Sequence, residues 1–358
     1  MNKIKIAVIG CGGISGCHLG GYSRNKDVEI YALCDINKER AEGRAKEYGV
    51  PLERVFTDKC EMFKALPEID AVSVCTWNNA HAECTFAALE AGKHVLCEKP
   101  MAMNAEEAKA MKAAAEKAGK LLMIGFVRRH GNDARVVKDF IDNGYFGDIY
   151  YAKAQYLRRN GNPGGWFGDK SRSGGGPLID LGVHVIDLVR YLVGRPKPVS
   201  AYGATFHKLG NRPDVKGARG YSAADAGDKA KEICDVEDLA SALIRFDNGM
   251  TLSVEASFSL NTKSDIGNIE LYGDKAGAKM DPELHLYTNI NGYMANVDFA
   301  SSTALSFSGL FDNEINHYVD CVLGRAESMA PAEDGVILMK ILDAIYKSAA
   351  TGHEVVIE

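Results

Sequence analysis

The first 124 residues alternate short apolar runs with helical patterns, and this alternation restricts the fold more than any other feature. Five apolar runs rich in β-branched residues have the length of strands: 3–9, 28–34, 71–75, 94–96 and 121–124. Ala-rich segments at 79–91 and 105–119 have helical composition and end at Gly92 and Gly119, and glycine is a typical C-terminal stop of a helix. Strands that alternate with helices predict βαβ units and therefore a doubly wound parallel sheet.

From residue 125 onward the pattern predicts a different architecture. Helical patterns occur at 133–143, 177–193 and 332–350, and strand-like runs at 148–157, 197–207, 236–246, 249–259 and 266–272. Strands joined in series by turns such as Asp247-Asn248-Gly249 favour an antiparallel sheet. We expect a Gly-rich loop at 158–176 and a long loop or lid at 208–235. The predicted domains are an α/β domain over 1–124 and an α+β domain over 125–358 with an open, mostly antiparallel sheet, whose last helix can pack back across both domains.

Composition and charge restrict the partners and the compartment. A length of 358 residues suits two domains, and 46% hydrophobic with 25% charged residues is typical of a folded soluble protein. The net charge of -6 and the lack of a basic run argue against a nucleic-acid partner. The nine cysteines form no Cys-x-x-Cys pair, which favours the reducing cytoplasm. No run of 18 uncharged apolar residues occurs, so we expect no membrane partner.

The first predicted strand leads directly into a glycine-rich turn. Residues 10–15 read Gly-Cys-Gly-Gly-Ile-Ser, a G-x-G-x-x-S form of the dinucleotide fingerprint, in which glycines let backbone N–H groups approach a pyrophosphate at a helix N-terminus. Asp35 ends the second predicted strand, where a carboxylate can accept hydrogen bonds from the adenosine ribose. Asp35 favours NAD over NADP, although Lys38 and Arg40 nearby keep NADP open. The predicted cofactor-binding residues of this turn are Gly10, Gly12, Gly13, Ile14 and Asp35; an ordinary glycine turn is the alternative.

Polar residues also follow the third and fourth predicted strands, at the sheet edge where ligands bind in open α/β folds. Asn78 suits a contact with ribose or nicotinamide, but it equally suits an N-cap for the following helix. Lys99 suits stabilisation of a substrate oxygen during hydride transfer, while a solvated turn is the alternative for Glu-Lys-Pro at 98–100. The further predicted cofactor-binding residues are Thr76, Asn78, His81, Glu98 and Lys99.

The apolar segment 177–193 contains three ionisable residues, Asp180, His184 and Asp187. If the segment is a regular α-helix, its 100° step places all three in one narrow stripe. Ionisable groups on an apolar helix are costly unless they pair or face a cleft. A histidine with an aspartate one turn before it suits a positioned general base. We therefore expect catalytic roles for His184 and Asp180, and leave a functional and a structural role equally open for Asp187.

These motifs together resemble the Gfo/Idh/MocA family, the relatives of glucose–fructose oxidoreductase and inositol dehydrogenase. The resemblance spans the whole chain, including the helix around 314–317. It implies an N-terminal Rossmann domain that binds NAD, a cis Lys99-Pro100 bond, and a sheet face that assembles a homodimer or homotetramer. It also implies that Lys99, Asp180 and His184 form the catalytic trio. Trp77 departs from the pattern, because many relatives have proline there.

The resemblance also suggests how a substrate is held. Arg158-Arg159-Asn160 and the loop around Trp166 resemble the members that act on sugars and glycosides, and an aromatic ring can stack on sugar C–H groups. Packing within the loop is the alternative for Trp166. Arg128 or Arg129 falls where members contact substrate. The predicted substrate-binding residues are Arg129, Trp166, Asp187 and His317, and we expect no metal site.

The leading hypothesis is an NAD(P)-dependent dehydrogenase that takes hydride from a secondary alcohol carbon of a sugar, inositol or glycoside. One alternative is a redox-neutral enzyme that cleaves glycosides through a keto sugar with tightly held NAD. Another is a protein that binds NAD or sugar without turnover, although retention of Lys99, Asp180 and His184 argues against it.

Overall fold

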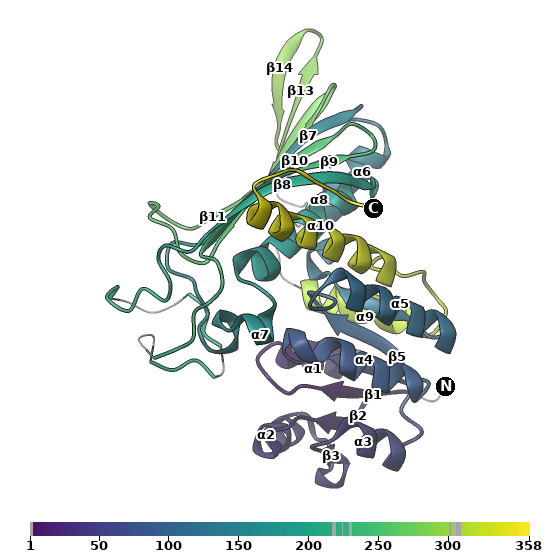
Figure 1. The fold of residues 1–358 in the computed structure, drawn as a ribbon. Helices are drawn as coiled ribbons and strands as arrows, with labels where there is room; N and C mark the ends of the chain where they lie inside the picture. Colours follow the sequence, from purple (N-terminus) through teal and green to yellow (C-terminus); the bar gives the residue numbers. More distant parts are fainter. Residues whose placement is uncertain are drawn as a thin grey trace. The chain divides into compact units, whose positions relative to one another are not determined.

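The computed structural model describes residues 3–216, 220–223, 225–228, 231–300, 303, 305 and 309–358. The chain divides into two compact units (Figure 1). The first unit consists of Met1–Val127 and Gly309–Met339, and the second of Arg128–Ser308 and Lys340–Glu358. Residues Gly309–Met339 therefore belong to the first unit, although they follow most of the second unit in the sequence. A single domain boundary near residue 124 places them in the second domain instead.

The first unit contains a six-stranded parallel sheet in the order β3-β2-β1-β4-β5-β6. Its strands are β1 (Ile4–Ile9), β2 (Val28–Cys34), β3 (Val55–Phe56), β4 (Ala71–Val74), β5 (His94–Glu98) and β6 (Leu122–Gly125). Its helices include α1 (Ser15–Arg24), α2 (Lys38–Tyr48), α3 (Lys59–Ala65), α4 (His81–Glu90), α5 (Ala105–Ala118) and α9 (Leu310–Val322). The strand order reverses between β1 and β4, and open α/β sheets bind ligands at such a point. The predicted doubly wound sheet is confirmed.

Short polar side chains set the helix starts in this unit. Asn37, Asp58 and Asn104 each accept a hydrogen bond from a backbone N–H three residues later, at the starts of α2, α3 and α5. Gly49 and Gly119 adopt the left-handed conformation at the ends of α2 and α5.

The second unit contains a nine-stranded sheet in the order β14-β13-β12-β11-β7-β10-β9-β8-β15. Only the β7–β10 pair is parallel among the strand pairs described. The strands are β7 (Ile149–Leu157), β8 (Pro198–Phe206), β9 (Leu239–Phe246), β10 (Thr251–Ser257), β11 (Ile266–Gly273), β12 (Ala276–Met280), β13 (His285–Ile290), β14 (Tyr293–Val297) and β15 (Val355–Val356). The predicted mostly antiparallel sheet is confirmed, with more strands than the sequence pattern indicated.

Helices α6 (Asn132–Asp142) and α8 (Val183–Leu192) pack against each other, and α8 packs on β7 and β11. The apolar side chains of Ala154, Ile244 and Val254 are buried on this face of the sheet. The last helix, α10 (Ala332–Thr351), belongs to the first unit up to Met339 and to the second unit beyond it.

Of the two segments expected to be loops, one contains short helical turns, and the described part of the other contains no helix or strand. The stretch 158–176 contains two short helical turns, Gly165–Gly168 and α7 (Lys170–Ser173). The described residues of 208–235 form turns and bends without helix or strand, as expected for a long loop. Residues 217–219, 224 and 229–230 of that stretch lie outside the described residues.

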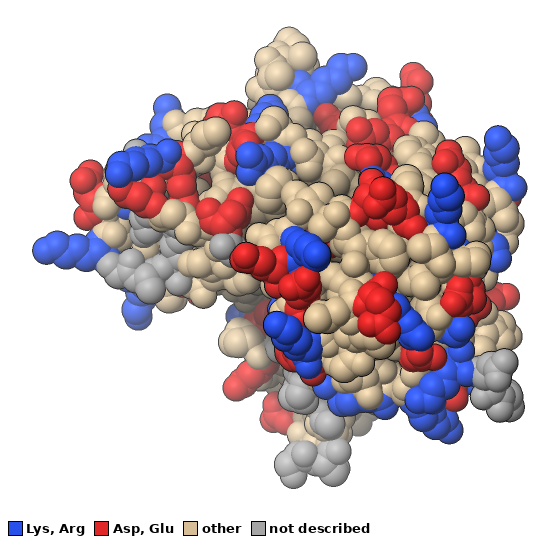
Figure 2. Space-filling view, turned by 90° about the horizontal axis from the view of Figure 1, so that it is seen from below, with Lys and Arg blue, Asp and Glu red and all other residues tan. Residues whose placement is uncertain are grey.

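None of the helices in the described part of the chain is long and apolar enough to cross a membrane. Figure 2 shows acidic and basic side chains intermingled on the face it presents, as a net charge of -6 on 42 basic and 48 acidic residues allows.

Candidate active site

The glycine turn after β1 has the geometry that a dinucleotide requires. Gly10 has a φ of 88°, and a Cβ there would lie 2.5 Å from the carbonyl oxygen of Cys75, so only glycine fits. A Cβ at Gly12 would meet no atom within 4 Å. Ile14 occupies the N-cap of α1 and makes no side-chain cap hydrogen bond. The turn is therefore open at Gly12, and the uncapped helix start offers N–H groups to a phosphate.

Asp35 lies directly after β2 and is 6% exposed. Its Oδ2 accepts a hydrogen bond from the backbone N–H of Cys11 at 2.7 Å, and its Oδ1 accepts one from Asn37 at 2.8 Å. The guanidinium of Arg40 lies 3.7 Å from Oδ2. The Asp35 carboxylate thus hydrogen-bonds both to the glycine turn and to the segment before α2, and it lies beside the turn. The turn, the helix start and this carboxylate fit an NAD molecule.

His81 begins α4 and is 1% exposed. Its Nδ1 lies 2.7 Å from the carbonyl oxygen of Pro100, and its Nε2 lies 3.2 Å from that of Thr76. Burial lowers the pKa of His81, so the neutral ring donates its one N–H most favourably to Pro100. His81 thereby links the segment that contains Thr76 to the segment that contains Lys99. A contact between His81 and NAD stays a prediction. Asn78 does not cap α4, whose N-cap is Ala80.

The Lys99-Pro100 peptide bond is cis, as the family resemblance implied. Lys99 is half-buried, and its backbone N–H donates to Oε2 of Glu98 at 3.1 Å. Glu98 Oε1 in turn lies 2.8 Å from Nε2 of His18, whose Nδ1 lies 3.1 Å from the hydroxyl of Ser73. The Glu98 side chain therefore supports the backbone of Lys99 from inside the unit.

The buried carboxyl group of Glu314 lies beside this pair and was not predicted. Glu314 is 0% exposed, and neither carboxylate oxygen has a hydrogen-bond partner. Burial, together with the negative charge of Glu98, raises the pKa of Glu314 well above its usual range. Burial also acts to raise the pKa of Glu98, but the hydrogen bond and charge of His18 lower it overall. Burial thus favours the protonated form of Glu314, whereas His18 favours the ionised form of Glu98.

One donor atom from each of His18, Glu98 and Glu314 lies within 4.8 Å of the other two. A metal ion would require an ionised Glu314, whereas its raised pKa favours a proton. The absence of a metal site therefore stays a prediction.

The segment with Asp180 and His184 differs from the regular helix assumed from the sequence. Residues Leu178–Gly182 form a π-helix, and α8 continues it from Val183. A π-helix bonds residue i to i+5, so the constant 100° step does not hold across the segment. Asp180 and His184 are both half-buried in the second unit.

Asp187 is paired inside the second unit. Its carboxylate accepts hydrogen bonds from Nε and Nη2 of Arg129, at 2.9 and 2.6 Å. Asp187 is 3% exposed and Arg129 is 1% exposed, and a buried pair of this geometry is costly to break. Their contact with substrate stays a prediction.

The other predicted substrate residues have partners of their own. Nε2 of His317, in α9 of the first unit, accepts a hydrogen bond from the N–H of Met329 at 3.0 Å, and burial lowers its pKa. Trp166, in the second unit, lies against Phe167 with ring centroids 4.0 Å apart. Phe167 meets the ring of Tyr221 edge-on at 6.0 Å.

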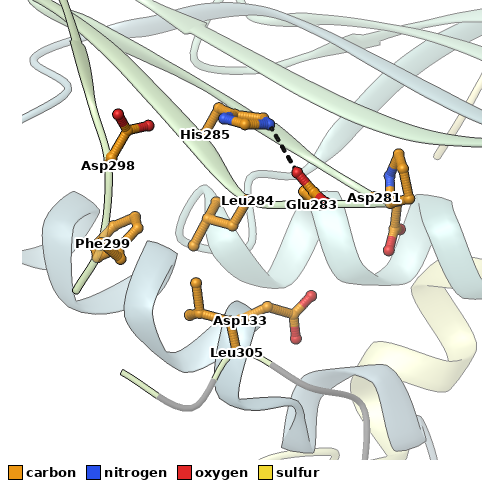
Figure 3. A pocket seen from close by; sticks show the side chains of 9 residues that line it. Asp133, Asp281, Glu283, Leu284, His285, Asp298, Phe299 and Leu305 are labelled. Atoms are coloured by element: carbon orange, nitrogen blue, oxygen red, sulfur yellow. Dashed lines mark ion pairs between the residues drawn. The ribbon is translucent and has the colours of Figure 1, made fainter. Parts of the chain in front are cut away.

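A pocket of about 320 Å³ in the second unit contains none of the predicted site residues (Figure 3). Asp133, Asp281, Glu283, His285 and Asp298 bring mostly negative charge to it. Arg128, next to the pocket, bridges Asp281 at 3.0 Å and Asp133 at 3.7 Å. Burial raises the pKa of Asp133. No pattern in the sequence joins these residues, because they come from α6, the β12–β13 turn, the first residue of β13 and the segment after β14.

Comparison with known proteins agrees with this geometry. Residues 4–126 match the family model described as "Oxidoreductase family, NAD-binding Rossmann fold", and residues 138–357 match "Oxidoreductase family, C-terminal alpha/beta domain". The D-glucoside 3-dehydrogenase of Escherichia coli (strain K12) is 36% identical over 357 residues, 99% of this chain and 97% of that protein. The levoglucosan dehydrogenase of Pseudarthrobacter phenanthrenivorans is 33% identical over 67% of this chain and 62% of that protein.

Solved structures show the same fold. A levoglucosan dehydrogenase in complex with NADH and levoglucosan matches with a TM-score of 0.84 at 24% identity, over 99% of this chain and 100% of that chain. An oxidoreductase domain protein from Kribbella flavida matches with a TM-score of 0.85 at 24% identity, over the whole of both chains. The glycine turn, the carboxylate after β2 and both family models lead to one conclusion: the chain belongs to the Gfo/Idh/MocA family of NAD-binding oxidoreductases.

Proposed function

We propose that this protein is an NAD-dependent dehydrogenase that oxidises the C3 hydroxyl group of a D-glucoside. The observation that carries this proposal is the 36% identity with D-glucoside 3-dehydrogenase over 99% of the chain. The alignment extends through both units, so it spans the positions expected to bind NAD and those expected to bind substrate.

The residues that carry the chemistry follow from the family resemblance. His184 removes the hydroxyl proton as general base, and Asp180 stabilises the imidazolium that forms. The ammonium of Lys99 stabilises negative charge on the substrate oxygen. NAD supplies the hydride acceptor when it is bound. Trp166 offers an aromatic face against which a sugar ring can stack.

The cofactor proposal rests on Asp35. A 2′-phosphate would meet the Asp35 carboxylate as a like charge, and Arg40, the nearest described cation, already lies 3.7 Å from that carboxylate. We expect calorimetric titration to show tighter binding of NAD than of NADP. Equal or tighter binding of NADP would show that Arg40 and Lys38 decide the preference.

A substrate screen tests the reaction. Methyl glucosides, a disaccharide with a glucosyl end, glucose 6-phosphate and myo-inositol are each incubated with NAD, and NADH is followed by its absorbance. We expect NADH with the glucosides, a 3-keto product in the NMR spectrum, and no signal from H184A under the same conditions. NADH from myo-inositol alone would overturn the glucoside assignment. Cleavage of a glycoside without NADH accumulation would favour the redox-neutral alternative, and no turnover of any compound would favour a binding protein.

We also propose that the protein works in the cytoplasm. All nine cysteines are free thiols, as expected in a reducing compartment. Fractionation of cells with an antibody against the protein tests this location.

A further inference from the structure

Glu237 lies just before β9 in the second unit and is 3% exposed. Its Oε2 accepts a hydrogen bond from the N–H of Gly176 at 3.0 Å. Its Oε1 accepts one from the N–H of Leu178 at 3.1 Å and one from the Tyr346 hydroxyl at 2.8 Å. The residue between the two amides is Pro177, which has no N–H. One carboxylate therefore binds both amides that flank the proline at the start of the helix.

The two bound residues connect directly to the candidate catalytic residues. The carbonyl oxygen of Gly176 accepts a hydrogen bond from the backbone N–H of Asp180 at 3.0 Å. The carbonyl oxygen of Leu178 accepts one from the N–H of Val183, the residue before His184. Through Gly176 and Leu178, the Glu237 carboxylate is linked to the backbone at Asp180 and next to His184.

The contacts around this carboxylate leave little freedom for the chain. A Cβ at Gly176 would lie 2.5 Å from the carbonyl oxygen of Glu237, and a Cβ at Gly175 would lie 2.1 Å from the Tyr346 hydroxyl. An anion at a helix N-terminus is also favoured by the helix dipole. The Gly-Gly-Gly-Pro turn at 174–177 is thus shaped around Glu237 and Tyr346.

We propose that Glu237 is a positioning residue, which holds Asp180 and His184 in the geometry for proton abstraction without itself contacting the substrate. The neighbouring residue Asp238 also has a carboxylate, but it binds a different segment of the chain. Asp238 accepts hydrogen bonds from the N–H groups of Lys208, Leu209 and Gly210. Adjacent carboxylates therefore anchor different segments, and only Glu237 binds the start of the helix with His184. The catalytic part of this proposal rests on the proposed function.

The main test is E237Q, which keeps the side-chain size but replaces one acceptor oxygen with an NH2 group. We expect kcat with a methyl glucoside to fall roughly 10- to 100-fold, because small displacements of reacting groups are costly. The Kd for NAD should be unchanged, since the dinucleotide residues lie in the first unit. The deuterium isotope effect on kcat, with deuterium at C3 of the glucoside, should increase because the chemical step becomes slower.

The isotope effect separates positioning from loss of folded protein, since a smaller active fraction lowers the rate but leaves the isotope effect unchanged. S348A is the matched control. Ser348 is buried in α10, where its hydroxyl accepts from Gly203 N–H at 2.9 Å and donates to the His353 carbonyl at 2.6 Å. We expect S348A to lower the melting temperature and leave both kcat and the isotope effect unchanged. An equal change in S348A, or a kcat within twofold in E237Q, would overturn the proposal.

Two further measurements keep the proposal testable. If E237Q does not fold, Y346F removes one donor to Glu237 and should lower kcat about threefold with a raised isotope effect; no change in either would refute positioning. If no glucoside reduces NAD, the proposed function fails, and hydrogen exchange then decides this inference. Exchange at the amides of Gly176, Leu178 and Asp180 should be faster in E237Q and unchanged in S348A. Unchanged exchange in E237Q overturns the inference whatever the substrate.

Discussion

Glu314 has a carboxyl group buried in the first unit, where both oxygens lack a hydrogen-bond partner. Burial, with a further contribution from Glu98, raises the pKa of Glu314 well above its usual range. In the unfolded chain this group ionises with an ordinary pKa of about 4.3. Between the two pKa values the folded protein keeps a proton that the unfolded chain releases. Glu314 therefore lowers the free energy of unfolding, and the loss grows as the pH rises above the unfolded pKa.

Replacement of Glu314 by glutamine keeps the shape of the side chain and removes its titration. We expect E314Q to raise the melting temperature at pH 7 by about 2–4 °C, with the gain shrinking towards pH 4. Thermal unfolding of E314Q and the unchanged protein across this pH range measures it. E98Q is the control and should be destabilising, because Glu98 pairs with His18 at 2.8 Å. A lower melting temperature of E314Q at pH 7 would contradict a destabilising Glu314 and would favour a bound partner, such as a cation held by His18, Glu98 and Glu314.

His184 and Asp180 are predicted to carry the proton transfer. We expect H184A to leave the fold and the NAD affinity nearly unchanged while lowering kcat roughly 10²-fold or more. D180N should also lower kcat, because an amide stabilises an imidazolium less well than a carboxylate does. Steady-state kinetics, with a melting curve for each variant, give the result. If H184A instead melts earlier and keeps its turnover per folded molecule, His184 is a packing residue and the mechanism is wrong.

At the scale of elements, the turn between β1 and α1 contains two glycines with different surroundings. G10A places a Cβ against the Cys75 carbonyl oxygen in a backbone with a φ of 88°, so we expect a lower melting temperature. G12A adds a methyl group where no atom lies within 4 Å, so the fold should persist. The same methyl group blocks the close approach of a pyrophosphate, and NAD should bind roughly tenfold more weakly, a loss of about 1.4 kcal/mol. Differential scanning fluorimetry and NAD titration measure both effects; unchanged NAD affinity in G12A would contradict the predicted cofactor position.

The sequence pattern predicted most elements but missed those with weak periodicity. Strand β3 has two residues, too few to show any period. The β13–β14 hairpin exposes Tyr293 and Met294, at 77% and 84%, so it lacks the alternation of a half-buried strand. Its Asn291-Gly292 turn was a usable signal, because both residues have a positive φ and Asn-Gly favours such hairpin turns. The π-helix at Leu178–Gly182 has the same apolar pattern as an α-helix, so the sequence could not distinguish them.

At the scale of the whole molecule, the nine-stranded sheet has one face without described helices. Strand pairing places Tyr202 opposite Leu243, and Tyr151 opposite Tyr272, on this open face. Tyr202 is 53% exposed and Leu243 is 43% exposed. Exposed apolar side chains on a broad sheet favour a self-complementary interface between two copies. We therefore propose a homodimer or homotetramer assembled through the open face.

Charge placed on this face should break the assembly. We expect the unchanged protein to be a dimer or tetramer at micromolar concentration, and Y202D to shift it towards monomer, because an aspartate would be buried without a partner. Light scattering coupled to size-exclusion chromatography gives both masses. L52D is the control, since Leu52 is 50% exposed in the first unit, and it should keep the oligomer. A monomeric unchanged protein would rule out the assembly.

The sequence by itself determined the fold class, the dinucleotide turn and the family. These depend on local information: periodicity, glycines at a strand end, and short motifs whose residues are neighbours in the chain. The tertiary structure decided which side chains have partners. Asp187 pairs with Arg129 across 58 positions, Glu237 binds Gly176 across 61, and Glu98 meets His18 across 80. No local pattern encodes such pairs, because burial and hydrogen bonding depend on which elements pack together. That packing is established only when the sheet and helices of each unit have folded.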